Sequence, residues 1–539
     1  MDRDRYVLAI DLGTGGPKTA LVSMRGEVLG HELIAVETRH LPDGGAVQDP
    51  ADWWRAITSS ARRLLASGLV RGGDVAAVAC TGQWASTVPV GADGQPAGPC
   101  ILWMDHRGGP YSAKVVGGPV TFAGYGPLKA LTWIRKSGGA PSPLGNDPLG
   151  HILYLRHEQP EVYARTKVFL EPVDYLNLRF TGVVAGTPAS MLLSWLTDNR
   201  NPGRVRYDRQ LVAMSTLDAG RLPPLQPTAS VVGAVLPEVA RDIGLPEGVP
   251  VVAGTPDLYS ASIGSGAVAD YEPHLAISTT SWLSCHVPFK RTDVGRQIAS
   301  IPSLIPGRYL LANNHETAGV CLQWLRDNVI VQEDGLLDAA AAPEGFGAYD
   351  RLAASVAAGS DGVIFTPWLA GERCPVDDHT VRAAFYNLSL RTTRAHMVRA
   401  VFEGVAYNAR WTLEAAEKFV RRRLGAIRFI GGGAASGVWC QIHADVLDRP
   451  VHRVAEPLLA NVKGAAVFAG LVLGHVRHDE VAGLARVDAT FEPEPAHRAI
   501  YDVLYREYPG LYHRQRKMYA RLNGSPLPSG GPKEGSHAP

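Results

Sequence analysis

The chain has 539 residues, too many for one hydrophobic core, so its length predicts two large domains. It is 46% hydrophobic and 19% charged with a net charge of +1, which excludes a disordered chain and a polyanion-binding protein, so we expect no nucleic-acid partner. Few apolar residues precede Asp11, and the longest apolar stretch elsewhere, residues 464–473, falls far short of the roughly 20 residues of a membrane span. We therefore expect a cytoplasmic protein with no signal peptide and no membrane contact.

The first predicted elements form a β-meander around a glycine-rich loop. Apolar strands are predicted at residues 6–10, 19–23 and 27–36, with the glycine-rich loop at 11–18 and a turn at Arg25 and Gly26. Residues 52–65 carry apolar side chains at helical spacing, and residues 75–80 form an apolar run typical of a buried strand. This mixture predicts an α/β fold.

A similar pattern returns after Pro250, which predicts a second domain built like the first. An apolar strand ends at Asp257, a small-residue segment follows, and another strand leads into a polar turn at residues 278–281. Further helices are predicted at 320–330, 393–422 and 437–447, and further strands at 362–369 and 427–433. We expect domains at residues 1–256 and 257–522, followed by a disordered Gly/Pro/Ser-rich tail at 523–539.

The glycine-rich loop at residues 11–18 suits a phosphate group. Its glycines, among them Gly13, let backbone amides approach phosphate oxygens, while Thr14 offers a hydroxyl and Lys18 a positive charge. Asp11 can hold a magnesium ion through water. An ordinary tight hairpin is the alternative, and the loop lacks the Gly-Lys-Ser/Thr of a Walker motif.

A second glycine-rich loop, residues 430–437, lies between a predicted strand and a predicted helix. Such a turn lets a flat ligand lie against bare backbone at a helix N-terminus, where a phosphate is also stabilised. A plain strand-to-helix turn is the alternative. A nicotinamide cofactor is disfavoured, because the G-x-G-x-x-G spacing is not kept.

Asp257 is the candidate general base, because a carboxylate at a rigid strand end can accept the proton of a hydroxyl that attacks a γ-phosphate. A helix N-cap is the alternative role for this residue. Gln83, Trp84, Trp103 and Asp105 suit a sugar, since they offer aromatic rings for its C–H surface and polar atoms for its hydroxyls. The alternative is a structural tryptophan with a solvated Asp–Arg pair.

Taken in this order, the segments resemble the FGGY carbohydrate kinase family over residues 6–476. The run 431–450 carries the resemblance most specifically, because many small, aromatic and polar positions match together. The other matching positions are Gln48-Asp49-Pro50, Trp53, Lys129, Trp133, Asp174-Tyr175, Gly319, Gln323-Trp324, Gly371-Glu372-Arg373 and Glu403-Gly404.

The resemblance implies two actin-like, ribonuclease-H-type domains that close on ATP and a sugar, with Asp257 as the general base and Asp11 as the magnesium-associated acid. The nucleotide-binding residues that it implies are Gly13, Thr14, Lys18, Thr280, Gly319, Gln323, Gly432, Gly433 and Gly437. The sugar-binding residues that it implies are Gln83, Trp84, Trp103, Asp105 and Asp257.

Three positions depart from the family pattern. Gly15 replaces a second hydroxyl residue, Ser23 replaces an acid, and Thr279 replaces the glycine that usually begins the second phosphate loop. Trp84-Ala85 stands where glycerol kinases and xylulokinases carry other pairs, which disfavours glycerol. We expect ATP-dependent phosphorylation of D-xylulose to xylulose 5-phosphate. A kinase for another pentulose or sugar alcohol, a non-catalytic ATP- and sugar-binding module, and a homodimer remain open.

Overall fold

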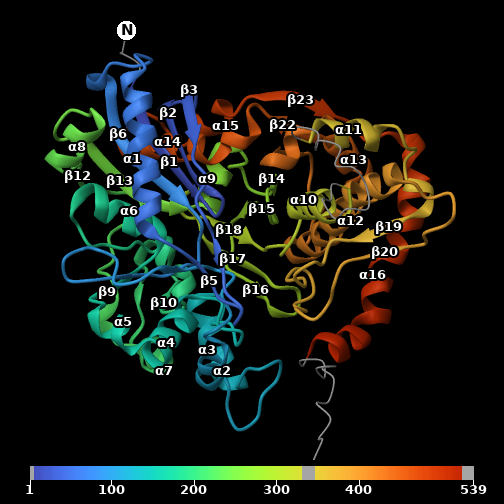
Figure 1. The fold of residues 1–539 in the computed structure, drawn as a ribbon, viewed down its shortest axis with the longest axis horizontal. Coiled ribbons are helices and arrows are strands. Elements are labelled where there is room, and N and C mark those ends of the chain that lie inside the picture. Colours follow the sequence, from blue (N-terminus) through green and yellow to red (C-terminus); the bar gives the residue numbers. More distant parts are fainter. Residues whose placement is uncertain (1–4, 331–345, 525–539) are drawn as a thin grey trace, which may run out of the picture.

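The computed structural model describes residues 5–330 and 346–524. Figure 1 shows two lobes, with the first half of the chain (blue to green) in the left-hand lobe and most of the second half (yellow to red) in the right-hand lobe. Each lobe is built on a mixed β-sheet covered by helices. Within the described ranges, no helix is both long enough and apolar enough to cross a membrane.

The first sheet has the strand order β12-β13-β6-β1-β2-β3. Its strands are β1 (Tyr6–Gly13), β2 (Gly16–Ser23), β3 (Val28–Leu33), β6 (Val75–Gly82), β12 (Val231–Ala234) and β13 (Pro250–Pro256). Strands β1, β2 and β3 are antiparallel neighbours, which confirms the predicted meander, while β6 lies parallel to β1 and β13 lies parallel to β6.

Helices bury both faces of the first sheet. Alternating residues of β1 face opposite sides, so that Leu8 and Ile10 pack against α1 (Pro50–Ala66), α6 (Pro172–Thr181) and α8 (Pro237–Ile243). Val7 and Ala9 face α14 (Ala460–Val472) instead. The predicted helix at 52–65 is confirmed as α1, whose first turn is capped by the carboxylate of Asp49.

Helix α14 comes from the second half of the chain but covers the first sheet (Figure 1). It crosses α9 (Asp257–Gly264) at two glycines. A Cβ on Gly264 would lie 1.8 Å from the Ala460 carbonyl oxygen, and one on Gly464 would lie 1.9 Å from the Ser260 carbonyl oxygen. Only glycine allows this approach, so the small residues of both helices bring the two halves of the chain together.

The second sheet has the strand order β16-β17-β18-β15-β14-β21-β22-β23, in which β14, β21 and β22 are parallel. Its strands are β14 (Pro273–Ile277), β15 (Ser281–Val287), β16 (Thr292–Asp293), β17 (Ile298–Pro302), β18 (Tyr309–Ala312), β21 (Ile427–Ile430), β22 (Val451–Val454) and β23 (Val487–Phe491). Its core packs against α12 (Arg394–Val420) and α13 (Gly437–Leu447), which confirms the helices predicted at 393–422 and 437–447.

Several predicted elements are shorter than expected. The strand predicted at 427–433 is only β21, which ends at Ile430, and the strand predicted at 27–36 is only β3, which ends at Leu33. The helix predicted at 320–330 is α-helical only as α10 (Gly319–Leu325) and continues as a π-helical turn, Arg326–Ile330. The strand predicted at 362–369 is only β19 (Ile364–Thr366). It ends where Pro367 begins, because proline has no N–H to donate to the strand ladder.

The remaining elements form smaller units around the two sheets. In the first half they are β4 (Arg39–His40), β5 (Ala46–Gln48), β7 (Val88–Val90), β8 (Cys100–Ile101), α2 (Gly109–Val116), α3 (Pro127–Ser137), α4 (Pro148–Glu158), α5 (Pro160–Arg165), β9 (Val168–Leu170), β10 (Thr197–Asp198), β11 (Arg206–Tyr207) and α7 (Arg209–Ser215). In the second half they are α11 (Gly347–Ala354), β20 (Ala384–Tyr386), α15 (Val481–Leu484) and α16 (Pro495–Asn523). Helix α16 includes Asn523, the first residue of the predicted tail, and residues 525–539 of that tail lie outside the described residues.

Candidate active site

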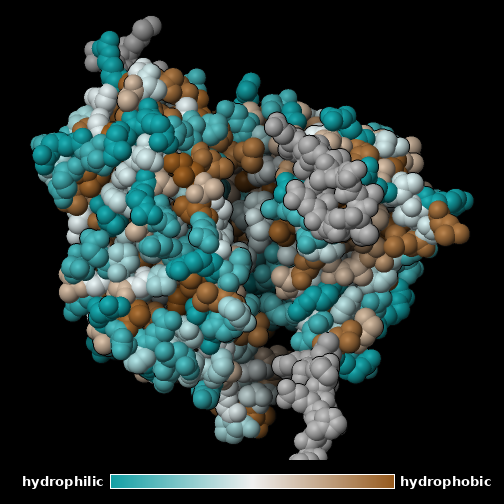
Figure 2. All heavy atoms as spheres, in the orientation of Figure 1, coloured by the Kyte–Doolittle hydropathy of each residue, from teal (hydrophilic) through white to brown (hydrophobic). Residues whose placement is uncertain are grey.

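Three parallel strands bring the predicted catalytic segments to one edge of the first sheet. Asp11 of β1 pairs with Thr81 of β6, and Thr255 of β13 pairs with the same Thr81. The carboxyl ends of parallel strands point toward the same edge of a sheet, and this register aligns the ends of β1, β6 and β13, so Asp11, the turn after β6 and Asp257 lie at the same edge. Figure 2 shows that the molecular surface is hollowed between the two lobes.

Asp257 lies at the start of α9 and is half-buried. Its Oδ1 accepts a hydrogen bond from the Leu258 amide at 2.7 Å, while Pro256 occupies the N-cap position. Burial, together with the negative charge of Asp11, raises the pKa of Asp257 from 3.8 to about 7. A carboxylate with this pKa can accept a proton near neutral pH.

Asp11 is buried and has two polar neighbours from different parts of the chain. The Lys18 ammonium lies 3.5 Å from Asp11 Oδ2, because the two residues are paired across the β1–β2 hairpin. Asn461, in the first turn of α14, donates from Nδ2 to Asp11 Oδ1 at 3.5 Å. Lys18 also donates to the Leu458 carbonyl oxygen at 2.8 Å. The first phosphate loop therefore contacts the second half of the chain.

A magnesium ion held through water fits this arrangement better than one held by a full set of protein ligands. Among the described residues, no cluster of three or more His, Cys, Asp or Glu side chains is arranged to hold a metal. Asp11 supplies one carboxylate, and magnesium usually keeps several waters and takes its other ligands from phosphates.

The hairpin tip connects the predicted phosphate loop with the predicted sugar residues. Thr14 Oγ1 accepts a hydrogen bond from Trp103 Nε1 at 3.2 Å and donates to Gln83 Oε1 at 3.4 Å. Gly16 has φ 134°, and a Cβ there would lie 2.1 Å from the Ile34 carbonyl oxygen. The glycine is needed at this position because a neighbouring backbone segment passes directly against it.

Gln48 is a buried hydrogen-bonding centre beneath this tip. Its Nε2 donates to the Thr14 carbonyl oxygen at 2.7 Å, and its Oε1 accepts from Trp53 Nε1 at 3.0 Å and from Gln83 Nε2 at 3.2 Å. Sequence reasoning assigned no role to Gln48 or to Asn461. Gln48 was visible only as part of a matching motif, and no local pattern marks Asn461.

The predicted sugar-binding residues differ in their solvent exposure and in the hydrogen bonds that they already make within the protein. Trp84 donates from Nε1 to the Ser190 carbonyl oxygen at 2.8 Å, and its ring lies 5.6 Å from that of Tyr259. Trp84 and Trp103 both remain partly exposed. Asp105 is 1% exposed, and its carboxylate accepts hydrogen bonds from the Ala46 amide and from Arg107. The Asp–Arg pair is therefore buried rather than solvated, and it connects segments of the protein.

The second sheet presents its two loops at a common edge, because β14 and β21 are parallel and pair at Ala276 and Ile430. In the turn after β14, the Ser278 amide donates to the Thr280 carbonyl oxygen at 2.9 Å. Gly319 at the start of α10 presses against this turn, since a Cβ on it would lie 2.2 Å from the Ser278 carbonyl oxygen.

The second glycine-rich loop follows β21, and its glycines differ in how closely they are packed. A Cβ on Gly433 would lie 2.8 Å from the Cβ of Ile277, so this glycine is packed against the end of β14. Gly432 is exposed, Gly437 begins α13 with space around it, and Gln323 on α10 is exposed. Gly432 and Gly437 therefore lie on the less tightly packed side of the loop.

Comparison with known proteins assigns the chain to a family. The N-terminal domain of the FGGY family of carbohydrate kinases matches residues 6–117 and 122–264, and the C-terminal domain of that family matches residues 277–473. The chain therefore belongs to the FGGY family of carbohydrate kinases. It is a phosphotransferase that acts on a carbohydrate.

Individual relatives agree with this assignment. The chain is 28% identical over 523 residues to the xylulose kinase of Staphylococcus epidermidis, which covers 96% of this chain and 98% of that protein. It is 25% identical over 475 residues to the gluconokinase of Bacillus subtilis, with coverages of 87% and 88%. The crystal structure of xylulose kinase from Rhodospirillum rubrum matches with a TM-score of 0.77 at 27% identity, covering 96% of this chain and 100% of that one. The predicted fold, two actin-like ribonuclease-H-type domains, is confirmed.

Proposed function

We propose that the protein transfers the γ-phosphoryl group of ATP to a hydroxyl of a small ketose, and that its preferred substrate is D-xylulose, which gives xylulose 5-phosphate. The observation that carries this proposal is the placement of Asp257, with a pKa of about 7, at the same sheet edge as Asp11 and the predicted sugar residues. The similarity to a xylulose kinase over nearly the whole chain supports the choice of sugar.

In the proposed reaction, Asp257 accepts the proton of the attacking hydroxyl as its oxygen bonds to the γ-phosphorus and the bond to the bridging oxygen of ADP breaks. Gly13, Thr14, Lys18 and Thr280 would bind the phosphates. Magnesium, held through water at Asp11, would supply charge neutralisation of the phosphates. Most of the rate acceleration would come from positioning and from electrostatic stabilisation.

The two substrates would approach from opposite lobes. We propose that residues 1–256 form the domain that carries the sugar site and the first phosphate loop, and that residues 257–522 form the domain that carries the nucleotide site. Gln83, Trp84 and Trp103 would bind the sugar in the first domain. The proposed nucleotide-binding residues of the second domain are Gly319, Gln323, Gly432, Gly433 and Gly437.

The test is a coupled assay of ADP release with D-xylulose, D-ribulose, gluconate, glycerol and a sugar-free control. We expect the highest kcat/KM for D-xylulose and little ADP without sugar. Preference for gluconate would reassign the substrate toward that of the Bacillus subtilis relative. No ADP with any sugar, combined with intact ATP binding in calorimetry, would instead support a non-catalytic module.

A further inference from the structure

Two buried carboxyl groups lie at the start of α6, Glu171 at the N-cap position and Asp174 in the first turn, behind the proposed sugar site. Glu171 is 2% exposed and Asp174 is not exposed at all. Oε1 of Glu171 and both carboxyl oxygens of Asp174 have no hydrogen-bond partner in the part of the chain that the structure describes. An unpaired buried charge is strongly unfavourable, so these groups call for an explanation beyond packing.

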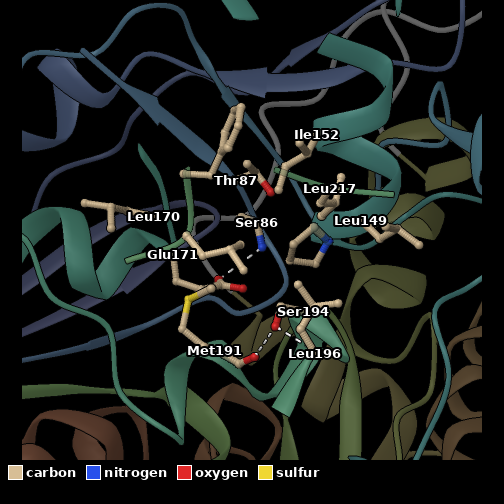
Figure 3. A pocket seen from close by; sticks show the side chains of 13 residues that line it. Ser86, Thr87, Leu149, Ile152, Leu170, Glu171, Met191, Ser194, Leu196 and Leu217 are labelled. Carbon is tan, nitrogen blue, oxygen red and sulfur yellow. Dashed lines mark hydrogen bonds between the residues drawn. The ribbon is translucent and has the colours of Figure 1, made fainter. Parts of the chain in front are cut away.

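The surroundings of the two carboxyl groups favour their neutral forms. Figure 3 shows Glu171 at the wall of a cavity whose other walls include Leu149, Ile152 and Leu170, and apolar side chains of this kind cannot solvate a carboxylate. Burial raises the pKa of Asp174 to about 8, and burial together with the charge of Asp174 raises the pKa of Glu171 well above its usual range.

Among the described residues, no neighbouring cation compensates the two carboxyl groups. Glu171 contributes to raising the pKa of the buried Cys100 thiol on β8, and Asp174 does the same for Tyr207 on β11, so both neighbours stay neutral near pH 8. The ring of His151 on α4, which is hydrogen-bonded to Thr87, is neutral as well, because burial lowers its pKa to about 4.

Glu171 connects to the sugar site through Ser86. Glu171 Oε2 accepts a hydrogen bond from the Ser86 amide at 3.3 Å, drawn as a dashed line in Figure 3. Ser86 Oγ accepts from the Trp103 amide at 3.1 Å, and the Trp103 indole in turn donates to Thr14 at the tip of the first phosphate loop. The position of Trp103 therefore depends on the position of Glu171.

Asp174 is connected to Trp84, the second tryptophan of the proposed sugar site, through Ser190. The Ser190 hydroxyl lies beside Asp174 and favours its charged form, but it donates its hydrogen bond to the Thr187 carbonyl oxygen at 3.2 Å. The Ser190 carbonyl oxygen accepts from Trp84 Nε1 at 2.8 Å. Both tryptophans of the proposed sugar site are thus held by segments that pack on this one pair of carboxyl groups.

We propose that Glu171 and Asp174 are positioning residues for the sugar site: as long as both carboxyl groups keep their protons, they hold the segments of Trp84 and Trp103 in the geometry that binds the sugar. This inference rests on the proposed sugar kinase activity. Loss of the Asp174 proton leaves a buried negative charge close to Glu171, and the residues that the structure describes supply no adjacent cation, so this charge is strongly unfavourable.

The test is the pH dependence of the two Michaelis constants in the wild-type protein and in Asp174→Asn, which cannot ionise. In the wild type, the sugar KM should rise about tenfold between pH 7 and pH 9, because one unit above a pKa of about 8 only about a tenth of the Asp174 side chains keep their proton. The ATP KM should stay constant. In Asp174→Asn the rise of the sugar KM should disappear, whereas in Glu171→Gln it should remain, because Asp174 can still lose its proton there.

Glu161→Gln is the matched control, since Glu161 is an exposed acid in the first turn of α5, and it should retain the wild-type pH profile. An identical rise of the sugar KM in the wild type and in Asp174→Asn, or a parallel rise of both Michaelis constants, would overturn the proposal. If the variants do not fold, the wild-type profile alone decides, because a flat sugar KM up to pH 9 contradicts it.

Urea unfolding separates this proposal from the kinase activity itself. A carboxyl group with a raised pKa in the folded state stabilises the protein most below its unfolded pKa, and the contribution is lost as the pH rises through the folded pKa. Wild-type stability should therefore fall toward pH 8, and Asp174→Asn should remove much of that fall. If no sugar is phosphorylated, the proposed function fails, whatever the unfolding data show. If the free energy of unfolding falls with pH as steeply in Asp174→Asn as in the wild type, Asp174 does not carry the proton that this proposal needs.

Discussion

Replacing Asp257 by Asn removes the proposed proton acceptor and little else. The Asn side-chain oxygen can still accept the hydrogen bond of the Leu258 amide, which spans 2.7 Å in the wild type, so the start of α9 should keep its structure. Loss of a general base typically lowers the rate about 10²- to 10⁴-fold. That range corresponds to about 3 to 5 kcal/mol of activation free energy. We expect this loss in kcat, with the thermal midpoint and the ATP affinity nearly unchanged.

The pH profile gives a second measure of the same residue. Because the base must be deprotonated, wild-type kcat should rise with pH through about 7, the raised pKa of Asp257. Asp11→Asn should shift this limb to lower pH. Burial is the larger cause of the raised pKa of Asp257 and remains in this variant, so the limb should stay above the usual pKa of an Asp side chain.

Magnesium titration distinguishes the two carboxylates. The defect of Asp11→Asn should be partly relieved by raising magnesium, whereas that of Asp257→Asn should not. Asp242→Asn, which removes an exposed carboxylate on α8, is the matched control and should behave as the wild type. Near-normal kcat in Asp257→Asn, on the sugar that the wild type prefers, would refute the assignment of the base.

Three further substitutions test the two ligand sites. Trp84→Ala should raise the sugar KM far more than the ATP KM, and equal effects or a loss of folding would make Trp84 a core residue. In Gly433→Val, the new Cβ would lie only 2.8 Å from the Cβ of Ile277, so the substitution should disturb the end of β14. ATP binding measured by calorimetry should then weaken about tenfold, while sugar binding stays nearly intact. Unchanged ATP affinity would count against that placement. Lys18→Met should raise the ATP KM about tenfold through the loss of a charge-assisted contact, and an unchanged ATP KM would exclude Lys18 from the phosphate site.

Much of the fold follows from local patterns that the structure confirms. The β1–β3 meander is encoded by short apolar runs separated by glycine turns, and α1 by apolar residues at helical spacing after Asp49 and Pro50. The docking of α14 on the first sheet does not follow from such patterns. Its apolar run predicts a buried helix, but the partner is selected by the fit of Gly464 against α9, which is remote in sequence.

In the candidate site, too, some features could be predicted from the sequence and others could not. The positions of Asp11 in the last part of β1 and of Asp257 directly after β13 could be predicted, because an apolar run ending in a polar residue marks the edge of a buried sheet. The partners of Asp105 and the contacts of Gln48 could not be predicted, because they depend on segments that meet only in the folded chain. Sequence spacing likewise gives no sign that Gly433 packs against Ile277.

Phosphorus NMR of a mixture of the protein with ATP, magnesium and D-xylulose tests sugar phosphorylation most directly, since it identifies the product rather than the loss of ATP. We expect the γ-phosphate signal to be replaced by a phosphomonoester signal that is coupled to the two protons of a terminal CH₂ group, together with ADP. Asp257→Asn should give almost none of this product in the same time. A spectrum that retains ATP unchanged, or that shows ADP with only inorganic phosphate, would contradict the proposed function.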